Sequence, residues 1–305
     1  MMYDVVIAGG GPAGLAAALA LGRARKRVLV CDAGPRRNAA AERMHNFLSR
    51  DGTPPDELRR IAREQLGRYP SVEVEDTGVR SITGERGAFH VDAGTRLVEA
   101  RRVLLATGMI DERLAIDGFA ERWGHSIVQC PYCHGWEARD RPWGYLLLPH
   151  TAAHAAMFAV QLRGWTREVT VFSHGAAIDD ELRARLDGAG IRIETAAIAR
   201  LDGDGAGLRA VTLAGGATVP CELLFAHPPQ QQVGLVRELG VKLDGDGFVE
   251  VDPMRQTSIA GVYAAGDLTT RGQGAILAAA AGTHAAAAIN AELTMELALA
   301  GALSV

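Results

Sequence analysis

The most constraining feature of this sequence is a complete βαβ signature within its first 32 residues. Gly9, Gly11 and Gly14 form a GxGxxG pattern directly after a short apolar run. The first glycine permits a tight turn, the second lets the backbone approach a pyrophosphate, and the third lets helix and strand pack closely. Asp32 ends the second apolar run, where a carboxylate can bind an adenosine ribose. The pattern predicts strands at 5–7 and 28–30 and a helix at 15–21.

A second region, residues 144–173, aligns on residues 3–32 without a gap. Its apolar runs coincide with those of the first unit, so a second βαβ fold is predicted. Side chains replace all the glycines and would obstruct a pyrophosphate, so we expect no dinucleotide there. A zincin motif would need Glu at 151, so we expect core or solvated histidines rather than a metal site at 150 and 154. The alignment places His150, Ala152, Ala155 and Ser173 at the positions of Gly9, Gly11, Gly14 and Asp32.

Between these units lies a CxxC pair, Cys130 and Cys133. Two cysteines at this spacing can close a small disulfide ring, and one thiolate can attack a partner's disulfide while the other resolves the mixed disulfide. His134 follows directly, and an imidazole that titrates near neutral pH can accept a proton from an incoming thiol. We expect Glu137 to orient this imidazole. The stretch therefore predicts thiol–disulfide exchange.

Three other interpretations of the pair exist. A zinc site needs further ligands at matching spacing, whereas Cys31 and Cys221 are solitary. The string CxxCH also marks covalent haem attachment, which implies export. The chain, however, opens on a nucleotide-binding pattern without a basic segment or a cleavage site. A purely structural pair of buried thiols is the third interpretation, and the surrounding motifs argue against it.

Composition bounds the class of protein. With 305 residues, the chain is expected to form two domains, each large enough to bury its own core. The 48% hydrophobic content, 22% charged content and net charge of -4 are those of an ordinary soluble globular protein and suggest no nucleic-acid partner. No run of about 18 apolar residues predicts a membrane span. Four cysteines in such a chain do not form a secreted disulfide scaffold, which favours a cytoplasmic location.

The remaining segments are expected to complete the two domains. Residues 72–103 alternate apolar and polar residues between turn signals, which predicts a small antiparallel sheet inserted in the parallel one. Residues 261–267 form a strand that ends at the carboxylate of Asp267. The other predicted elements are a helical segment at 55–68, a buried strand at 103–108, a crossing to the second domain at 111–126, a helix that carries the CxxC pair and a helix from about 273 to 288.

The order of four motifs resembles the low-molecular-weight thioredoxin reductase family over essentially the whole chain. These are GxGxxG at 9–14, the strand ending at 106–108, CxxC at 130–133 and the segment 261–267. The resemblance implies an α/β fold with two Rossmann-like domains: an FAD domain at 1–114 and 245–305, and an inserted, degenerate nicotinamide-type domain at 115–244. It also implies non-covalent FAD and a homodimer. Cys133 would then lie against the flavin, and Cys130 would meet the substrate.

The candidate cofactor-binding residues follow from these motifs. Asp267 is placed to hold a ribityl hydroxyl, and the N-terminus of the next helix could face the flavin pyrimidine and favour the anion formed on reduction. No metal ligand is expected. The candidates are Gly9, Gly11, Pro12, Ala13, Gly14, Asp32, Ala33, Asn38, His45, Asn46, Ala106, Thr107, Gly108, Gly266, Asp267, Gln273, Gly274 and Ala275.

Two departures from the family's reductases matter. Members that use NADPH keep a second glycine motif and arginines that bind the 2'-phosphate, whereas this chain has Ser173, His174 and Gly175 there, so we expect no use of NADPH. The reductases usually carry Asp after the second cysteine, whereas this chain has His134. The segment 130–137 is more similar to a branch containing flavin-dependent dithiol oxidases, such as those that close disulfides in gliotoxin and holomycin, and some reductase-like proteins independent of pyridine nucleotides.

The leading hypothesis is therefore an FAD enzyme that oxidises a dithiol, with oxygen as final acceptor. The dithiol would belong to a small molecule, a peptide or a thioredoxin-like protein. A second hypothesis is a thioredoxin reductase-like enzyme whose flavin is reduced by another donor, such as ferredoxin. A third is a non-catalytic sensor that binds a partner according to the redox state of Cys130 and Cys133. We expect no nucleic-acid or membrane partner.

Overall fold

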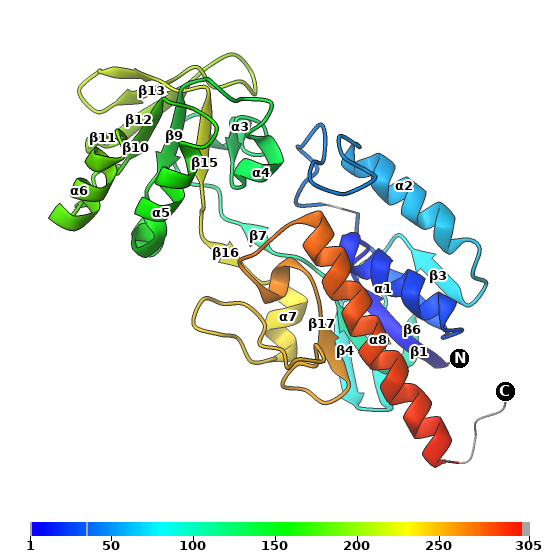
Figure 1. Cartoon of the computed structure of the whole chain (residues 1–305). Helices are drawn as coiled ribbons and strands as arrows, with labels where there is room; N and C mark the ends of the chain where they lie inside the picture. Colours follow the sequence, from blue (N-terminus) through cyan, green and yellow to red (C-terminus); the bar gives the residue numbers. More distant parts are fainter. Residues whose placement is uncertain (1, 35, 301–305) are drawn as a thin grey trace. The chain divides into compact units, whose positions relative to one another are not determined.

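The computed structural model describes residues 2–34 and 36–300, which divide into two compact units (Figure 1). Unit 1 comprises the described residues of Met1–Arg37, Phe47–Ile110 and Gln230–Val305, and unit 2 comprises Asn38–Asn46 and Asp111–Pro229. Each unit has a mainly parallel sheet with helices packed on it. The predicted α/β class, with one Rossmann-like fold inserted in the sequence of another, is confirmed.

Unit 1 is built on a seven-stranded sheet in the order β3-β2-β1-β6-β5-β4, with β17 also paired to β6. The first half of β6 is antiparallel to β5, and its second half lies parallel between β1 and β17. Buried and exposed residues alternate in the first half, whereas the second half is buried throughout, as expected where both faces are covered. The strands are β1 (Met2–Ala8), β2 (Val28–Cys31), β3 (Val72–Glu75), β4 (Ser81–Glu85), β5 (Ala88–Asp92), β6 (Leu97–Leu105) and β17 (Val262–Ala264).

Helices α1 and α8 lie side by side and pack on one face of this sheet (Figure 1). Their approach depends on small residues: a Cβ at Gly282 would lie 2.0 Å from the carbonyl oxygen of Ala13. Helix α8 continues to Leu299, beyond the predicted end at 288. The helices of unit 1 are α1 (Pro12–Arg23), α2 (Pro55–Leu66), α7 (Gly234–Leu239), the short 3-10 turn η2 (Asp267–Thr269) and α8 (Ala275–Leu299).

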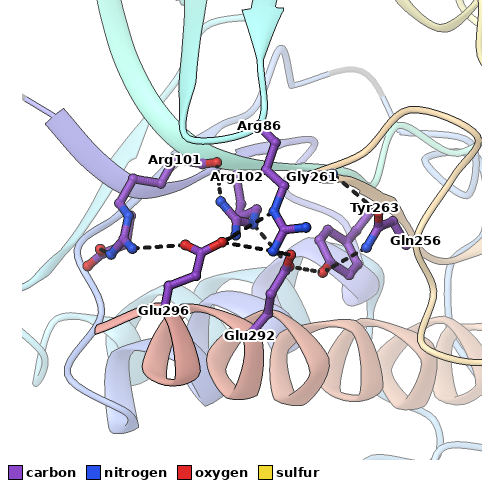
Figure 2. A network of polar contacts seen from close by, with 9 residues as sticks. Arg86, Arg101, Arg102, Gln256, Gly261, Tyr263, Glu292 and Glu296 are labelled. Atoms are coloured by element: carbon purple, nitrogen blue, oxygen red, sulfur yellow. Dashed lines mark hydrogen bonds and ion pairs between the residues drawn. The ribbon is translucent and has the colours of Figure 1, made fainter. Parts of the chain in front are cut away.

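An ion-pair network fastens the C-terminal half of α8 to the sheet (Figure 2). Arg102 on β6 is fully buried; its Nε donates to Glu292 at 3.0 Å and its Nη2 donates to Glu296. Arg101 adds a 3.0 Å bond to Glu296, and the Tyr263 hydroxyl donates to Glu292. Burial alone would raise the pKa of Glu292, but the bonds from Arg102 and Tyr263 outweigh it and hold that pKa below its usual range. The buried guanidinium is thus compensated only when α8 lies in this register.

Unit 2 has a five-stranded parallel sheet in the order β11-β10-β9-β15-β8 and a separate antiparallel sheet, β12-β13-β14. Short strands β7 (Ile110–Asp111) and β16 (Gln230–Gln231) pair with each other. The strands are β8 (Ile127–Val128), β9 (Trp143–Leu146), β10 (Val169–Phe172), β11 (Arg192–Glu194), β12 (Ile198–Asp202), β13 (Ala210–Leu213), β14 (Thr218–Pro220) and β15 (Leu223–Ala226). The helices are α3 (Phe119–Arg122), α4 (Pro131–His134), η1 (Pro149–Thr151), α5 (Ala152–Leu162) and α6 (Asp180–Gly188).

Two expectations about organisation differ from the structure. The antiparallel strands β4 and β5 are present, but they extend the main sheet through β6, and β3 pairs in parallel with β2, so residues 72–103 do not form a separate sheet. Alternation reports a half-buried strand and not the direction of its neighbour. Residues 230–244 belong to unit 1 rather than to the inserted domain, because Val236 and Val241 bury their side chains in its core.

Candidate active site

The GxGxxG turn connects β1 to α1, and its glycines have different roles. A Cβ at Gly9, where φ is +112°, would lie 2.3 Å from the Ala106 carbonyl oxygen, and one at Gly14 would lie 1.9 Å from the Gly9 carbonyl oxygen. Backbone packing therefore requires both. No described atom lies within 4 Å of a Cβ built at Gly11, which caps α1. This opening at a helix N-terminus is where a diphosphate would find free N–H groups.

Asp32 follows β2 directly and is only 6% exposed. Its Oδ1 accepts a hydrogen bond from the Gly34 amide at 3.1 Å, and its Oδ2 accepts from Arg59 Nε at 2.9 Å. A Cβ at Gly10 would lie 2.3 Å from Oδ2, so only a glycine lets the carboxylate lie against the turn. A carboxylate has about four acceptor positions, which leaves room for a ribose hydroxyl. Arg59, on α2, had no signal in the sequence because its contact is tertiary.

The segment after β17 brings a second group of candidates to the start of α1. Gly266 has φ +95°, and a Cβ there would lie 3.1 Å from the Cβ of Ala13. The next residue, Asp267, contacts Arg37 Nη1 through its Oδ2 at 3.0 Å, and the same nitrogen donates to Gln273 Oε1 at 2.5 Å. Asp267 and Gln273 are therefore brought together as candidates. Arg37 joins them unpredicted, although its neighbour Asn38 was a candidate.

Several buried atoms of unit 1 have no hydrogen-bond partner among the described residues. They include Thr107 Oγ1, Arg36 Nε and Arg63 Nε. Buried polar atoms are normally bonded, so each indicates a missing partner. Thr107 lies in the candidate segment after β6, Arg36 lies in the loop after Asp32, and Arg63 Nη2 is 3.5 Å from Asp32 Oδ2. Together with the opening at Gly11, these atoms fit a dinucleotide such as FAD.

The other cofactor candidates fall into two groups. Ala33, Ala106, Gly108, Pro12, Gly274 and Ala275 lie in unit 1, with Gly274 capping α8, whereas Asn38, His45 and Asn46 group with unit 2. The loop at 38–46 packs on unit 2 closely: a Cβ at Gly124 would lie 2.7 Å from the Cβ of Ala40. Proximity to Asp32 in the sequence therefore did not decide the neighbours of this loop.

Cys130 and Cys133 flank the single helical turn α4, with Cys130 as its N-cap. Both are free thiols and half-buried, and their Sγ atoms lie 2.6 Å apart. The hydrogen bond from Cys133 lowers the pKa of Cys130 to about 7 against the opposing effect of burial, and the backbone amides of Cys133 and Tyr132 lower it further. Cys130 is therefore the thiol that ionises near neutral pH. The helix predicted around this pair is only one turn long.

The other two cysteines differ from this pair. Burial raises the pKa of Cys31 and of Cys221 to about 12, so both are structural thiols. Within the described residues, no group of three or more His, Cys, Asp or Glu side chains is placed to hold a metal ion.

His134 is half-buried beside the cysteines. Burial lowers its pKa below the usual value, although the Cys130 carbonyl and the charge of Glu137 act in the opposite direction. Its Nδ1 is buried and has no hydrogen-bond partner among the described residues. The imidazole is therefore neutral at neutral pH and has a free ring nitrogen, as a general base requires.

Glu137 does not orient His134 through a described hydrogen bond. Its Oε1 instead lies 3.5 Å from Nε2 of His45, and it influences His134 through its charge alone. Helix α4 ends at His134, so the two residues are not neighbours on one helix face, as three-residue spacing would require. His45, a cofactor candidate, is thereby placed beside the segment that follows the CxxC turn.

Aromatic packing holds the CxxC turn in place. A Cβ at Gly135 would lie 3.0 Å from the Trp143 ring and 3.1 Å from the Trp165 ring, so glycine lets the chain pass close to both. Tyr132, between the cysteines, lies edge-on to Trp165 with ring centroids 5.4 Å apart. The requirement for Gly135 could not be derived from the sequence, because both tryptophans follow it in the chain.

The turn of the second βαβ unit is longer than the ungapped alignment supposed. Ala8 pairs with Cys31 in unit 1, and Leu146 pairs with Phe172 in unit 2, so Leu146 rather than Pro149 takes the place of Ala8. The turn at 147–151 contains η1 and no glycine. His150 Nε2 lies 2.9 Å from the carbonyl oxygen of His227, as a histidine bonded within its own unit. The glycines are absent in either alignment.

Comparison with known proteins identifies the family. The model of the pyridine nucleotide-disulphide oxidoreductase family matches residues 3–286, and the chain belongs to this family. Thioredoxin reductase tcpT of Claviceps purpurea is 35% identical over 281 residues, covering 87% of this chain and 86% of the relative. Thioredoxin reductase aclD of Aspergillus oryzae is 31% identical, covering 97% and 98%. An oxidoreductase of Agrobacterium tumefaciens has a similar structure, with a TM-score of 0.89, 37% identity and coverage of 97% and 99%.

These similarities establish a thioredoxin reductase-like oxidoreductase in a family whose members typically bind FAD. Among the helices described, none is long and apolar enough to cross a membrane.

Proposed function

We propose that this protein is an FAD-dependent enzyme that oxidises a dithiol to a disulfide, with oxygen as final acceptor. The observation that carries the proposal is the acidity of the Cys130 thiol, whose pKa is about 7, beside a neutral imidazole. A dithiol whose reduced form is stabilised makes a more oxidising disulfide. The pair is therefore suited to taking electrons from substrate thiols.

The exchange would proceed in two displacements. His134 accepts the proton of a substrate thiol, the resulting thiolate attacks Cys130 Sγ of the Cys130–Cys133 disulfide, and Cys133 leaves as a thiolate. The second substrate thiol loses its proton and attacks the substrate sulfur of the mixed disulfide. Cys130 then leaves as a thiolate, which its low pKa favours, and the substrate disulfide departs. FAD, when bound, would supply the two-electron chemistry that restores the enzyme disulfide and passes the electrons to oxygen as peroxide.

The residues that would hold FAD are those around the Gly11 opening, Asp32, Thr107 and Asp267. Replacement of the second glycine turn by Leu147, Pro149 and Thr151 supports independence from NADPH. A reductase fed by another donor is the alternative, favoured by the printed names of the relatives, which are thioredoxin reductases.

The test is anaerobic mixing of the purified yellow protein with a dithiol, with NADPH and with reduced ferredoxin in separate experiments. Bleaching of the flavin by the dithiol, with oxygen uptake equal to disulfide formed once air is admitted, supports the proposal. If no small or peptide dithiol supports oxygen uptake while ferredoxin drives thioredoxin reduction, the oxidase assignment is wrong and the alternative stands.

A further inference from the structure

Arg37 is the centre of a polar network at the start of α8. Its side chain is 20% exposed, and its Nη1 contacts Asp267 Oδ2 at 3.0 Å and Gln273 Oε1 at 2.5 Å. Gln273 Nε2 donates to Gln230 Oε1 at 2.8 Å, and Gln230 Nε2 donates back to Gln273 Oε1 at 3.1 Å. A guanidinium, a carboxylate and two amides from four separate segments are therefore connected.

The network lies next to the glycine turn. Gly266, which precedes Asp267, approaches the Cβ of Ala13 in the first turn of α1. The same helix begins at the Gly11 cap, where the structure leaves an opening. Printed contacts thus run from Arg37 through Asp267 to the residues that border the opening.

Charge balance argues for a cation at this place. A diphosphate brings two negative charges to a turn already flanked by Asp32 and Asp267. The N-terminus of α1 offers only about half a positive charge. Arg59 is bonded to Asp32, and Arg36 pairs with Asp56. Arg37 is the arginine that contacts Asp267.

We propose that Arg37 is a cofactor-positioning residue that binds the diphosphate of FAD, and that the paired amides of Gln273 and Gln230 hold its guanidinium in place. Planar guanidinium groups suit phosphate oxygens because they donate two parallel hydrogen bonds. This inference rests on the FAD cofactor of the proposed function and is independent of the thiol substrate.

The test measures the binding of FAD to flavin-free protein. Arg37→Gln should weaken FAD about 10- to 100-fold, the usual scale for a lost charge-assisted hydrogen bond, and Arg37→Lys should restore part of the affinity. Arg271→Gln is the matched control, because Arg271 is half-exposed just before α8 and pairs with Asp246. It should leave FAD affinity unchanged.

Two competitors separate a phosphate contact from a packing effect. In displacement of FAD, Arg37→Gln should weaken ADP by the same factor as FAD and leave adenosine, which lacks phosphate, unchanged. Unchanged FAD affinity, or an equal loss for ADP and adenosine, would overturn the proposal. If Arg37→Gln does not fold, Arg37→Lys and Gln273→Leu carry the same comparison. Intact FAD binding without dithiol oxidation would contradict only the proposed function.

Discussion

In unit 1 the turn between β1 and α1 holds the glycines of GxGxxG, whereas in unit 2 the turn between β9 and α5 holds Leu147, Pro149 and Thr151 and no glycine. Both turns join a buried parallel strand to a helix. Unit 1 keeps the backbone opening at Gly11, and unit 2 instead carries Cys130, Cys133 and His134 ahead of its β9 strand. The same supersecondary unit can therefore persist as a scaffold after its nucleotide-binding backbone is lost, because side-chain packing alone maintains it.

Removal of Cys133 should have the largest effect on this division of roles. Cys133→Ser should abolish dithiol turnover and leave FAD bound, because unit 1 is untouched. Cys130→Ser should also abolish turnover but leave the Cys133 thiolate beside oxidised flavin, which should add a broad long-wavelength charge-transfer absorbance. Absorbance spectra of both variants test this assignment, and the same band in Cys133→Ser would reverse the roles of the two thiols.

Pyridine nucleotides test the degenerate turn directly. NADPH and NADH should fail to bleach the flavin at ordinary turnover rates, roughly 1 to 1000 per second, because the turn at 147–151 offers no glycine for a pyrophosphate. Stopped-flow mixing under anaerobic conditions is the measurement. Bleaching on that scale would show that unit 2 keeps a working nucleotide site.

A matched pair of substitutions compares the two turns. Gly11→Val should fold, because Gly11 has φ -77° and open space at its Cβ, and it should weaken FAD about 100-fold or more by filling that space. Ala152→Val, at the exposed start of α5, should leave FAD binding unchanged. Fluorescence titration of flavin-free protein checks both. Equal FAD affinity in Gly11→Val and the unaltered chain would place the cofactor elsewhere.

The base in unit 2 should matter about as much as the opening in unit 1. His134→Ala should slow flavin reduction by a dithiol roughly 100-fold, the usual scale of a lost general base, while FAD stays bound. Because burial lowers the pKa of His134, the unaltered rate should stay level as pH falls to the usual histidine range and decline only below it. An unaffected rate in His134→Ala, at any pH, would exclude the imidazole as base.

The smallest expected effect is a shift in thiol ionisation. In the reduced protein, alkylation of Cys130 by iodoacetamide should rise with pH about a midpoint near 7, whereas Cys31 and Cys221, whose pKa values are about 12, should stay unmodified across neutral pH. Cys133→Ala removes the hydrogen bond that is the main cause and should raise the Cys130 midpoint. Peptide mapping after timed alkylation reports all three. An unmoved midpoint in Cys133→Ala would assign the low pKa to the backbone amides.

Local patterns in the sequence were sufficient for the first βαβ unit. The strand, the glycines, the helix and Asp32 lie within one short segment, and each glycine is required by atoms of that segment or of the adjacent β6 end. Asp32 and Asp267 were placed correctly at strand ends because a buried parallel strand is recognisable from its continuous apolar run. The reactive pair was recognisable from its spacing.

Contacts between distant segments were decided only by the tertiary structure. The direction of β3, the membership of 230–244 in unit 1 and the pairing of Glu137 with His45 all depend on which surfaces meet after folding. The same holds for Arg37 and Arg59, whose guanidinium groups reach carboxylates far away in the chain or on another element. Periodicity and spacing describe the surface that one segment offers, whereas the partner of a charged or half-buried side chain is chosen by the packing of the whole unit, where an uncompensated buried charge is costly.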